Sequence, residues 1–138
     1  MNRIGVTLVE LLIVMIIVGV LAAIAIPLFA RTKQQVEIAL MRSDLRVLET
    51  AEDAYFADAQ GYATATSCHY PAPAGSALWC VSAGNVLGAI TTGTGTQAGW
   101  TVSVTNVNVG LSCAMYVGTV TPAAPATARD AEGVPICR

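Results

Sequence analysis

The first thirty residues are dominated by one uninterrupted apolar run. Between Val6 and Phe29 the chain has a single charged residue, Glu10. As an α-helix this run would be about 36 Å long, enough to cross the roughly 30 Å hydrocarbon core of a bilayer. Because it has no polar face at helical spacing, the run must be buried in lipid or among other helices. We predict a membrane helix over residues 6–30, bent at Pro27.

Glu10 distinguishes this run from a plain membrane anchor. A carboxylate there costs a few kcal/mol in lipid unless it is paired or protonated, so a partner is expected. If the chain were cut after Gly5, Val6 would carry a new α-amine four residues before Glu10, at helical spacing. The carboxylate could pair with that amine or with the amine of a neighbouring chain, and the second arrangement would set the axial stagger between identical helices.

The next thirty residues have the pattern of an amphipathic helix, predicted over residues 31–60 and capped by Gly61. At about 100° per residue, one arc gathers apolar side chains that would pack on the rest of the domain. They are Val36, Leu40, Met41, Val47, Leu48, Ala51, Ala54 and Tyr55. Glu37, Asp44 and Asp58 fall inside this arc. We expect them to reach solvent at its edge, although partners from the domain or from a neighbouring chain are an alternative.

Residues 61–138 combine a long uncharged loop region with strand patterns. Trp100–Thr105 alternates apolar and hydroxyl residues, which predicts a half-buried antiparallel strand. Leu111–Val120 is its expected partner, and at least one more strand is needed, near Leu78–Val86 or near the C-terminus. The predicted fold class is α+β: a long N-terminal helix, half membrane and half amphipathic, packed on a small antiparallel sheet.

Four cysteines, all beyond the apolar run, indicate two disulfides in an oxidising compartment. Cys68 and Cys80 would close a loop of about thirteen residues, worth near 3 kcal/mol, and Cys113 and Cys137 one of about twenty-five, worth roughly 3.5 kcal/mol. We prefer this pairing, but the other two pairings stay open. No metal site is expected, because the chain has no Cys-x-x-Cys spacing and one histidine, His69.

Charge and motif content argue against several functions. The net charge is −2, which does not suggest nucleic-acid binding, and no acid–base pair, nucleophile triad or phosphate-binding loop is present. We therefore expect neither an enzyme nor a cofactor.

The orientation in the membrane is not decided by the charges that flank the apolar run. Arg3 precedes the run, and Arg31 and Lys33 follow it, so the positive-inside rule gives almost no preference. The cysteines instead place the C-terminal domain outside the cytoplasm.

The stretch Gly5-Val6-Thr7-Leu8-Val9-Glu10 resembles the signal of type IV prepilins. The resemblance implies that residues 1–5 are a leader cleaved after Gly5 by a prepilin peptidase, that Val6 becomes the N-methylated N-terminus, and that the helix over residues 6–30 forms a filament core. Glu10, Gly19 and Pro27 match residues of the family, and the Gly19–Pro27 stretch could lose helicity in a filament. Val6 departs from the pattern, since phenylalanine is usual there. A secretory signal fits less well, because Glu10 interrupts its apolar core, and a plain anchor leaves the Gly5–Glu10 spacing unexplained.

This resemblance implies a structural subunit of a type IV pilus-like filament. Its partners would be identical or related pilin subunits, the peptidase, the inner-membrane assembly machinery and, before assembly, the lipid bilayer. The precursor would lie in the inner membrane and the product in a cell-surface pilus. One alternative is a type II secretion pseudopilin. Major pseudopilins commonly have an acidic calcium-binding loop, but here Asp130 and Glu132 alone supply few carboxylate ligands for such a site. Another is a minor pilin for adhesion or DNA uptake, for which Arg129 and Arg138 supply little positive charge.

Overall fold

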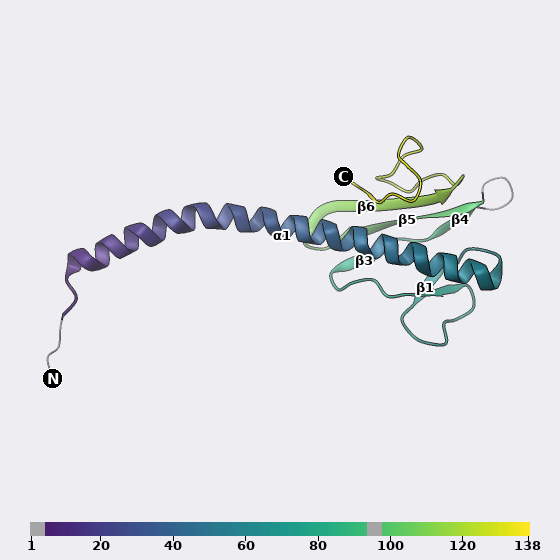
Figure 1. The fold of residues 1–138 in the computed structure, drawn as a ribbon, viewed down its shortest axis with the longest axis horizontal. Coiled ribbons are helices and arrows are strands. Elements are labelled where there is room, and N and C mark those ends of the chain that lie inside the picture. Colours follow the sequence, from purple (N-terminus) through teal and green to yellow (C-terminus); the bar gives the residue numbers. More distant parts are fainter. Residues whose placement is uncertain (1–4, 94–97) are drawn as a thin grey trace. The chain divides into compact units, whose positions relative to one another are not determined.

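The computed structural model describes residues 5–93 and 98–138, so residues 1–4 of the expected leader lie outside the described part. Its elements are one long helix, α1 (Leu8–Ala59), followed by short strands (Figure 1). The chain divides into two units, residues 1–35 and residues 36–138, which are described separately below. We call residues 36–138 the head domain.

The first unit is the N-terminal part of α1, and its apolar side chains are in contact with little protein. From Val6 to Phe29 the large apolar residues are 50–79% exposed. Gly19 and Pro27 both lie within the helix, so the stretch between them is helical in the single chain. By length and composition alone, α1 can cross a membrane.

The head domain contains two sheets. In the larger one the strand order is β3-β5-β6-β7, and β4 also pairs with β5. These strands are β3 (Asn85–Leu87), β4 (Thr91–Gly93), β5 (Gly99–Asn106), β6 (Val109–Gly118) and β7 (Ile136–Cys137). A separate parallel pair joins β1 (Ala65–Ser67) to β2 (Ser76–Leu78). All pairings in the larger sheet are antiparallel.

The hairpin expected from the alternating pattern is present. β5 and β6 pair with Trp100 opposite Val117 and Val104 opposite Cys113. Additional strands come from both regions that the sequence indicated, because β3 overlaps the first region and pairs with β5, while β7 lies near the C-terminus and pairs with β6. β4, which pairs with the other end of β5, lies beyond the first region and was not predicted. The α+β prediction of a long helix with a small antiparallel sheet is therefore confirmed.

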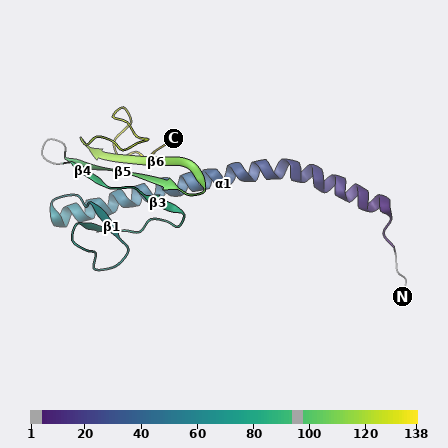
Figure 2. The ribbon, with the colours of Figure 1, turned by 180° about the vertical axis from the view of Figure 1, so that it is seen from behind.

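The main core lies between the sheet and the part of α1 that belongs to the head domain, which run as two layers in Figures 1 and 2. Met41, Leu45 and Leu48 of the helix meet Trp100, Val102, Val104, Cys113 and Met115 of the sheet. The predicted apolar arc was therefore too broad. The helix packs by one edge of it, while Val36, Leu40, Val47 and Ala54 at the other edge are exposed.

The opposite face of the sheet is also covered, so the expectation of a half-buried β5 was wrong. The C-terminal segment, yellow in Figure 1, lies along β6 and packs Ala123, Ala126 and Ile136 on Ala114 and Tyr116. Thr101 is only 2% exposed; its hydroxyl donates to the Met115 carbonyl and accepts from the Ala123 N–H. Alternation identified the strand, but a hydroxyl face can be buried when a loop supplies its hydrogen bonds.

The expectation that the acidic residues in the arc reach solvent was wrong for Asp44, which is 6% exposed. Its carboxylate accepts hydrogen bonds from the Ser82 N–H at 3.1 Å, the Ser82 hydroxyl at 2.6 Å and the Asn85 side-chain amide at 2.6 Å. Glu37, at the same side, accepts from the Asn106 amide at 2.9 Å. Ser82, in the loop before β3, and Asn85, the first residue of β3, thus provide the donors that allow the Asp44 carboxylate to be buried.

Glu52 is a second buried carboxyl, and no sequence pattern singled it out. It is fully buried, and one of its oxygens accepts the Ala63 N–H at 2.8 Å, while the other has no hydrogen-bond partner among the described residues. Burial, helped by the negative charge of Asp53, raises the pKa of Glu52 to about 7 against the hydrogen bond from Ala63. The carboxyl therefore ties the end of α1 to the chain that follows it.

The helix ends differently from the prediction that Gly61 caps it. α1 stops at Ala59, and Gln60 takes the left-handed conformation with φ 55°. The Gln60 N–H donates to the Phe56 carbonyl at 2.8 Å, which closes the last turn. Phe56 then packs on Tyr62 with ring centroids 4.9 Å apart, so the chain turns back one residue earlier than expected.

Replacing Asp44 tests the buried hydrogen-bond network. Asp44→Ala leaves donors of Ser82 and Asn85 without their acceptor, so we expect a loss of about 2–3 kcal/mol in the free energy of unfolding. Denaturant unfolding of the full chain in detergent micelles, followed by tryptophan fluorescence, measures it. Asp58→Ala is the matched control, because Asp58 is exposed and has no partner among the described residues; it should change stability by less than about 0.5 kcal/mol. Equal effects of the two variants would contradict the network's role.

The raised pKa of Glu52 predicts that the free energy of unfolding falls as pH rises. Because its pKa is raised in the folded state, its contribution is fully present below the ordinary value of 4.5 and is lost as pH rises through about 7. Between pH 5 and pH 8 this amounts to on the order of 2 kcal/mol. Glu52→Gln should flatten the profile and be relatively more stable at pH 8, whereas Asp58→Asn should leave the slope unchanged. An unaltered slope in the Glu52 variant would show that this carboxyl does not titrate as described.

Candidate processing and assembly site

The start of α1 is held by a reciprocal pair of residues, Thr7 and Glu10. Thr7 immediately precedes the helix, and the Glu10 carboxylate accepts both the Thr7 N–H at 2.9 Å and the Thr7 hydroxyl at 3.0 Å. The Thr7 hydroxyl in turn accepts the Glu10 N–H at 3.3 Å. This is a capping box, in which two free amide groups of the helix start are satisfied by two side chains. The spacing Thr-x-x-Glu before an apolar run is its sequence signature, so the role of Thr7 was readable from the sequence although it was not predicted.

The capping box leaves part of Glu10 available. Both contacts from Thr7 go to the same oxygen, Oε2. Oε1 makes no hydrogen bond within the part of the chain that the structure describes, and the residue is exposed. A carboxylate can accept several hydrogen bonds, so Glu10 can keep the helix cap and still bind a second, cationic donor.

Gly5 and Val6 lie before the helix, in exposed chain that belongs to no helix or strand. A Cβ added at position 5 would meet no atom within 4 Å, and the same holds at Gly19. Packing within this chain therefore gives no reason for glycine at either position. A requirement for Gly5 or Gly19 would have to come from another molecule that approaches the backbone closely.

The disulfides follow the pairing preferred from the sequence. Cys68 is joined to Cys80 and Cys113 to Cys137, and no described cysteine is free. The first disulfide closes the exposed loop between β1 and Trp79. The second joins directly opposed residues of β6 and β7, so it fastens the chain end to the sheet.

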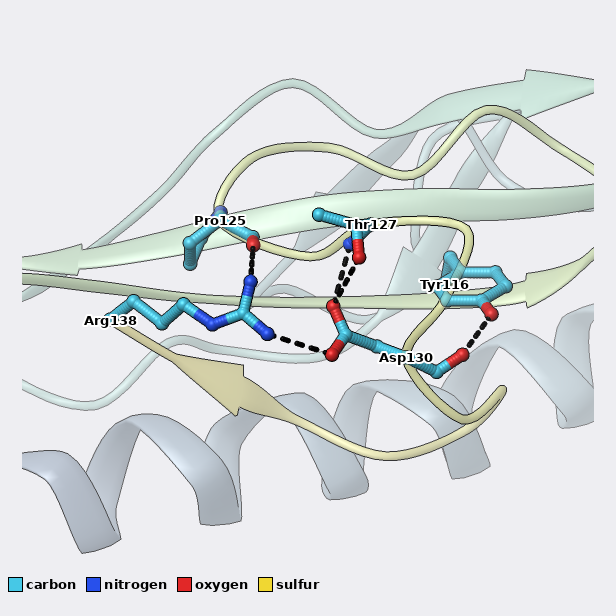
Figure 3. Close-up of polar contacts among 5 residues, drawn as sticks. All are labelled: Tyr116, Pro125, Thr127, Asp130 and Arg138. Carbon is cyan, nitrogen blue, oxygen red and sulfur yellow. Dashed lines mark hydrogen bonds and ion pairs between the residues drawn. The ribbon is translucent and has the colours of Figure 1, made fainter.

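The C-terminal segment is further held by Asp130 (Figure 3). Its carboxylate accepts the Thr127 N–H and hydroxyl, both at 2.8 Å, and pairs with the Arg138 guanidinium at 2.8 Å. These hydrogen bonds from Thr127, and then the charge of Arg138, lower the pKa of Asp130. The Tyr116 hydroxyl donates to the Asp130 carbonyl at 2.5 Å, and Arg138 also donates to the Pro125 carbonyl at 3.3 Å.

The other carboxylate considered as a calcium ligand is engaged as well. Glu132 accepts the Gly118 N–H at 2.5 Å. Among the described residues no group of three or more His, Cys, Asp or Glu side chains could hold a metal ion. His69 lies in the exposed loop, where its N–H contacts the Ser67 hydroxyl at 3.2 Å.

Comparison with known proteins agrees with this geometry. Residues 1–26 match the family described as the prokaryotic N-terminal methylation motif. The chain is 41% identical over 61 residues to the type IV major pilin protein PilA of Myxococcus xanthus (strain DK1622). That match spans 44% of this chain and 27% of the relative's length. No solved structure matches significantly.

The motif and the relative agree with what the first residues of the sequence indicated, and the fold has the helix, sheet and disulfides expected with them. Residues 1–26 thus carry a prokaryotic N-terminal methylation motif, and over part of its length the chain is similar to a type IV major pilin.

Proposed function

We propose that this chain is the repeating structural subunit of a type IV pilus-like filament. One observation carries the proposal: a helix that is apolar on all sides, 50–79% exposed at its large side chains, begins inside an N-terminal methylation motif. Such a surface is not stable in water and has to be covered by lipid or by similar helices. Lipid covers it in the precursor, and identical or related subunits cover it in the filament.

Processing prepares the helix for assembly. A prepilin peptidase cuts after Gly5, which is exposed and lies outside the helix, and Val6 becomes the methylated N-terminus. The new amine is positive, and the Glu10 carboxylate of an adjacent subunit pairs with it. Pairing neutralises two charges that are each costly to bury alone. Because Oε1 of Glu10 is not used by the capping box, the pair can form without unwinding the helix start.

The precursor spans the inner membrane with the head domain outside the cytoplasm, from which the assembly machinery extracts it. Two disulfides support this orientation, since such bonds persist in oxidising compartments. Assembly then carries the head domain to the cell surface. In the filament the Gly19–Pro27 stretch is free to lose helicity, because neither residue favours a helix interior.

A surface pilin fits the head domain better than a secretion pseudopilin or a minor tip subunit. The calcium loop that major pseudopilins commonly carry needs free carboxylates, but Asp130 binds Arg138 and Thr127 while Glu132 binds Gly118. The relative is itself described as a major pilin. Arg129 and Arg138 do not form a basic patch for DNA, and Arg138 is already paired.

Two substitutions at Glu10 test the proposal and separate its two roles. Glu10→Ala removes both the cap and the charge, whereas Glu10→Gln keeps an oxygen for Thr7 and removes only the charge. Both variants should insert into the membrane in normal amounts, because the charge that opposes insertion is gone. Both should reduce the yield of sheared surface filaments at least about tenfold, since a pair worth a few kcal/mol is lost at every subunit.

The control is Asp53→Asn, which removes an exposed charge from the head-domain part of α1. It should leave filament yield unchanged. Filaments of normal number and length from Glu10→Gln would overturn the charge-pairing mechanism. Absence of filaments from the unmodified chain would overturn the proposed function itself.

A further inference from the structure

A groove of about 500 Å³ runs between the end of α1 and the disulfide-closed loop of the head domain. Its walls include Ala54, Tyr55 and Asp58 from the helix and Tyr70, Pro73 and Leu78 from the loop. Figures 1 and 2 both show that loop, which follows β1, beside the end of α1. Tyr70 is 87% exposed and Leu78 52% exposed, so the groove presents apolar and aromatic surface to the outside.

Asp58 is the only charged residue among those that line the groove. It makes no hydrogen bond or ion pair with any described residue, in contrast to the carboxylates of Asp44 and Asp130, which each accept three hydrogen bonds. A negative charge at the edge of an apolar, tyrosine-lined groove is complementary to a cation carried on an apolar body. The occupant therefore needs a positive charge and exposed large apolar side chains on one face.

One face of α1 itself meets this description. Residues three and four apart share a helix face, so Lys33 lies between Phe29, one turn before it, and Val36, one turn after it. Phe29 is 74% exposed and Val36 is exposed as well. Lys33 has no ion pair within the described residues, and Glu37, the acidic residue one turn on, accepts a hydrogen bond from Asn106 instead.

The other cations of α1 do not have such a face. Arg46 has no large apolar residue three or four positions away. The large apolar neighbours of Arg42 at this spacing, Ile38 and Leu45, pack in the core of their own domain. Arg31 has one exposed apolar neighbour, Leu28, on one side only.

We propose that this groove docks the Phe29–Lys33–Val36 face of a second copy of the chain. Lys33 of one copy pairs with Asp58 of the other, and Phe29 packs against Tyr55 and Tyr70. The inference rests on the proposed function, because it names a contact between subunits of the same filament. It adds a contact away from the Glu10 end of the helix, one that involves the head domain.

Charge exchange is the first test, with sheared surface filaments from the full chain as the readout. Asp58→Lys and Lys33→Asp should each lower the filament yield at least about threefold, because like charges face each other at every contact. The double variant, with the charges exchanged, should recover most of the loss. Asp53→Lys is the matched control: it reverses an exposed charge five residues away on the charged side of α1, and should have little effect.

Engineered cysteines provide the second test, since the described native cysteines are all paired. Filaments carrying both Lys33→Cys and Asp58→Cys should give a ladder of covalent multimers without reductant, whereas an intrachain bond would leave only monomer. Either single variant, or Lys33→Cys combined with Asp53→Cys, should give no ladder.

The outcomes separate this contact from the proposed function. Normal filaments from the unmodified chain, with no loss in the charge-reversed variants and no ladder from the cysteine pair, would overturn the groove contact alone. Asp58→Lys could instead lower the filament yield without recovery in the charge-exchanged double variant and without a ladder from the cysteine pair. That result would overturn the proposed contact and assign the groove to a different occupant. If the unmodified chain forms no filaments, both proposals fail together.

Discussion

An apolar helix that the chain leaves exposed is the constraint on which everything else depends. Fully burying one large apolar side chain is worth about 1.5–3 kcal/mol, and the exposed run from Val6 to Phe29 contains many of them. Their sum exceeds the roughly 5–15 kcal/mol that stabilises a typical folded domain. Glu10 opposes burial by only about 3 kcal/mol. Apolar burial therefore favours association with lipid or with other helices, and in the proposed filament the role left to Glu10 is to align neighbouring helices.

The head domain is stabilised by contacts of its own, independent of what surrounds the N-terminal part of α1. Its larger sheet has strands as short as two and three residues, and among the described residues only β5 and β6 are longer. Two disulfides add about 3 and 3.5 kcal/mol by loop-closure entropy. Asp44 links α1 to Ser82 in the loop before β3 and to Asn85 at the start of β3, and Asp130 and Arg138 hold the chain end on the other side of the sheet. Each of these contacts lies within the head domain, so none depends on where the apolar run is embedded.

Long periodic patterns were readable from the sequence, and short-range or loop-dependent features were not. The apolar run and the alternation in Trp100–Thr105 each repeat over enough residues to identify a helix and a strand. By contrast, β1 to β4 are three residues each and pair through backbone groups that carry no side-chain signature. The apolar arc of the helix was found, but its division into a packed edge and an exposed edge depends on where the sheet lies.

In the candidate site and the buried carboxyls, too, local features can be read from the sequence and features that depend on distant residues cannot. The capping box of Thr7 and Glu10 is local, and the Thr-x-x-Glu spacing is enough to predict it. The burial of Asp44 depends on donors from Ser82 and Asn85, about forty residues away, and no periodicity in the helix could indicate them. Glu52 depends in the same way on Ala63 beyond the helix end. Cleavage, methylation and assembly involve other molecules, so they stay predictions that a single chain supports without testing.

Intact mass spectrometry of protein sheared from the cell surface tests the central claim most directly. If the chain is an assembled pilin, its mass should correspond to a polypeptide that begins at N-methylated Val6 and is four hydrogens lighter because of its two disulfides. That one value would establish processing, export and assembly together. A chain that still carries residues 1–5 and occurs only in membranes would contradict the account and return the protein to a simple membrane-anchored domain.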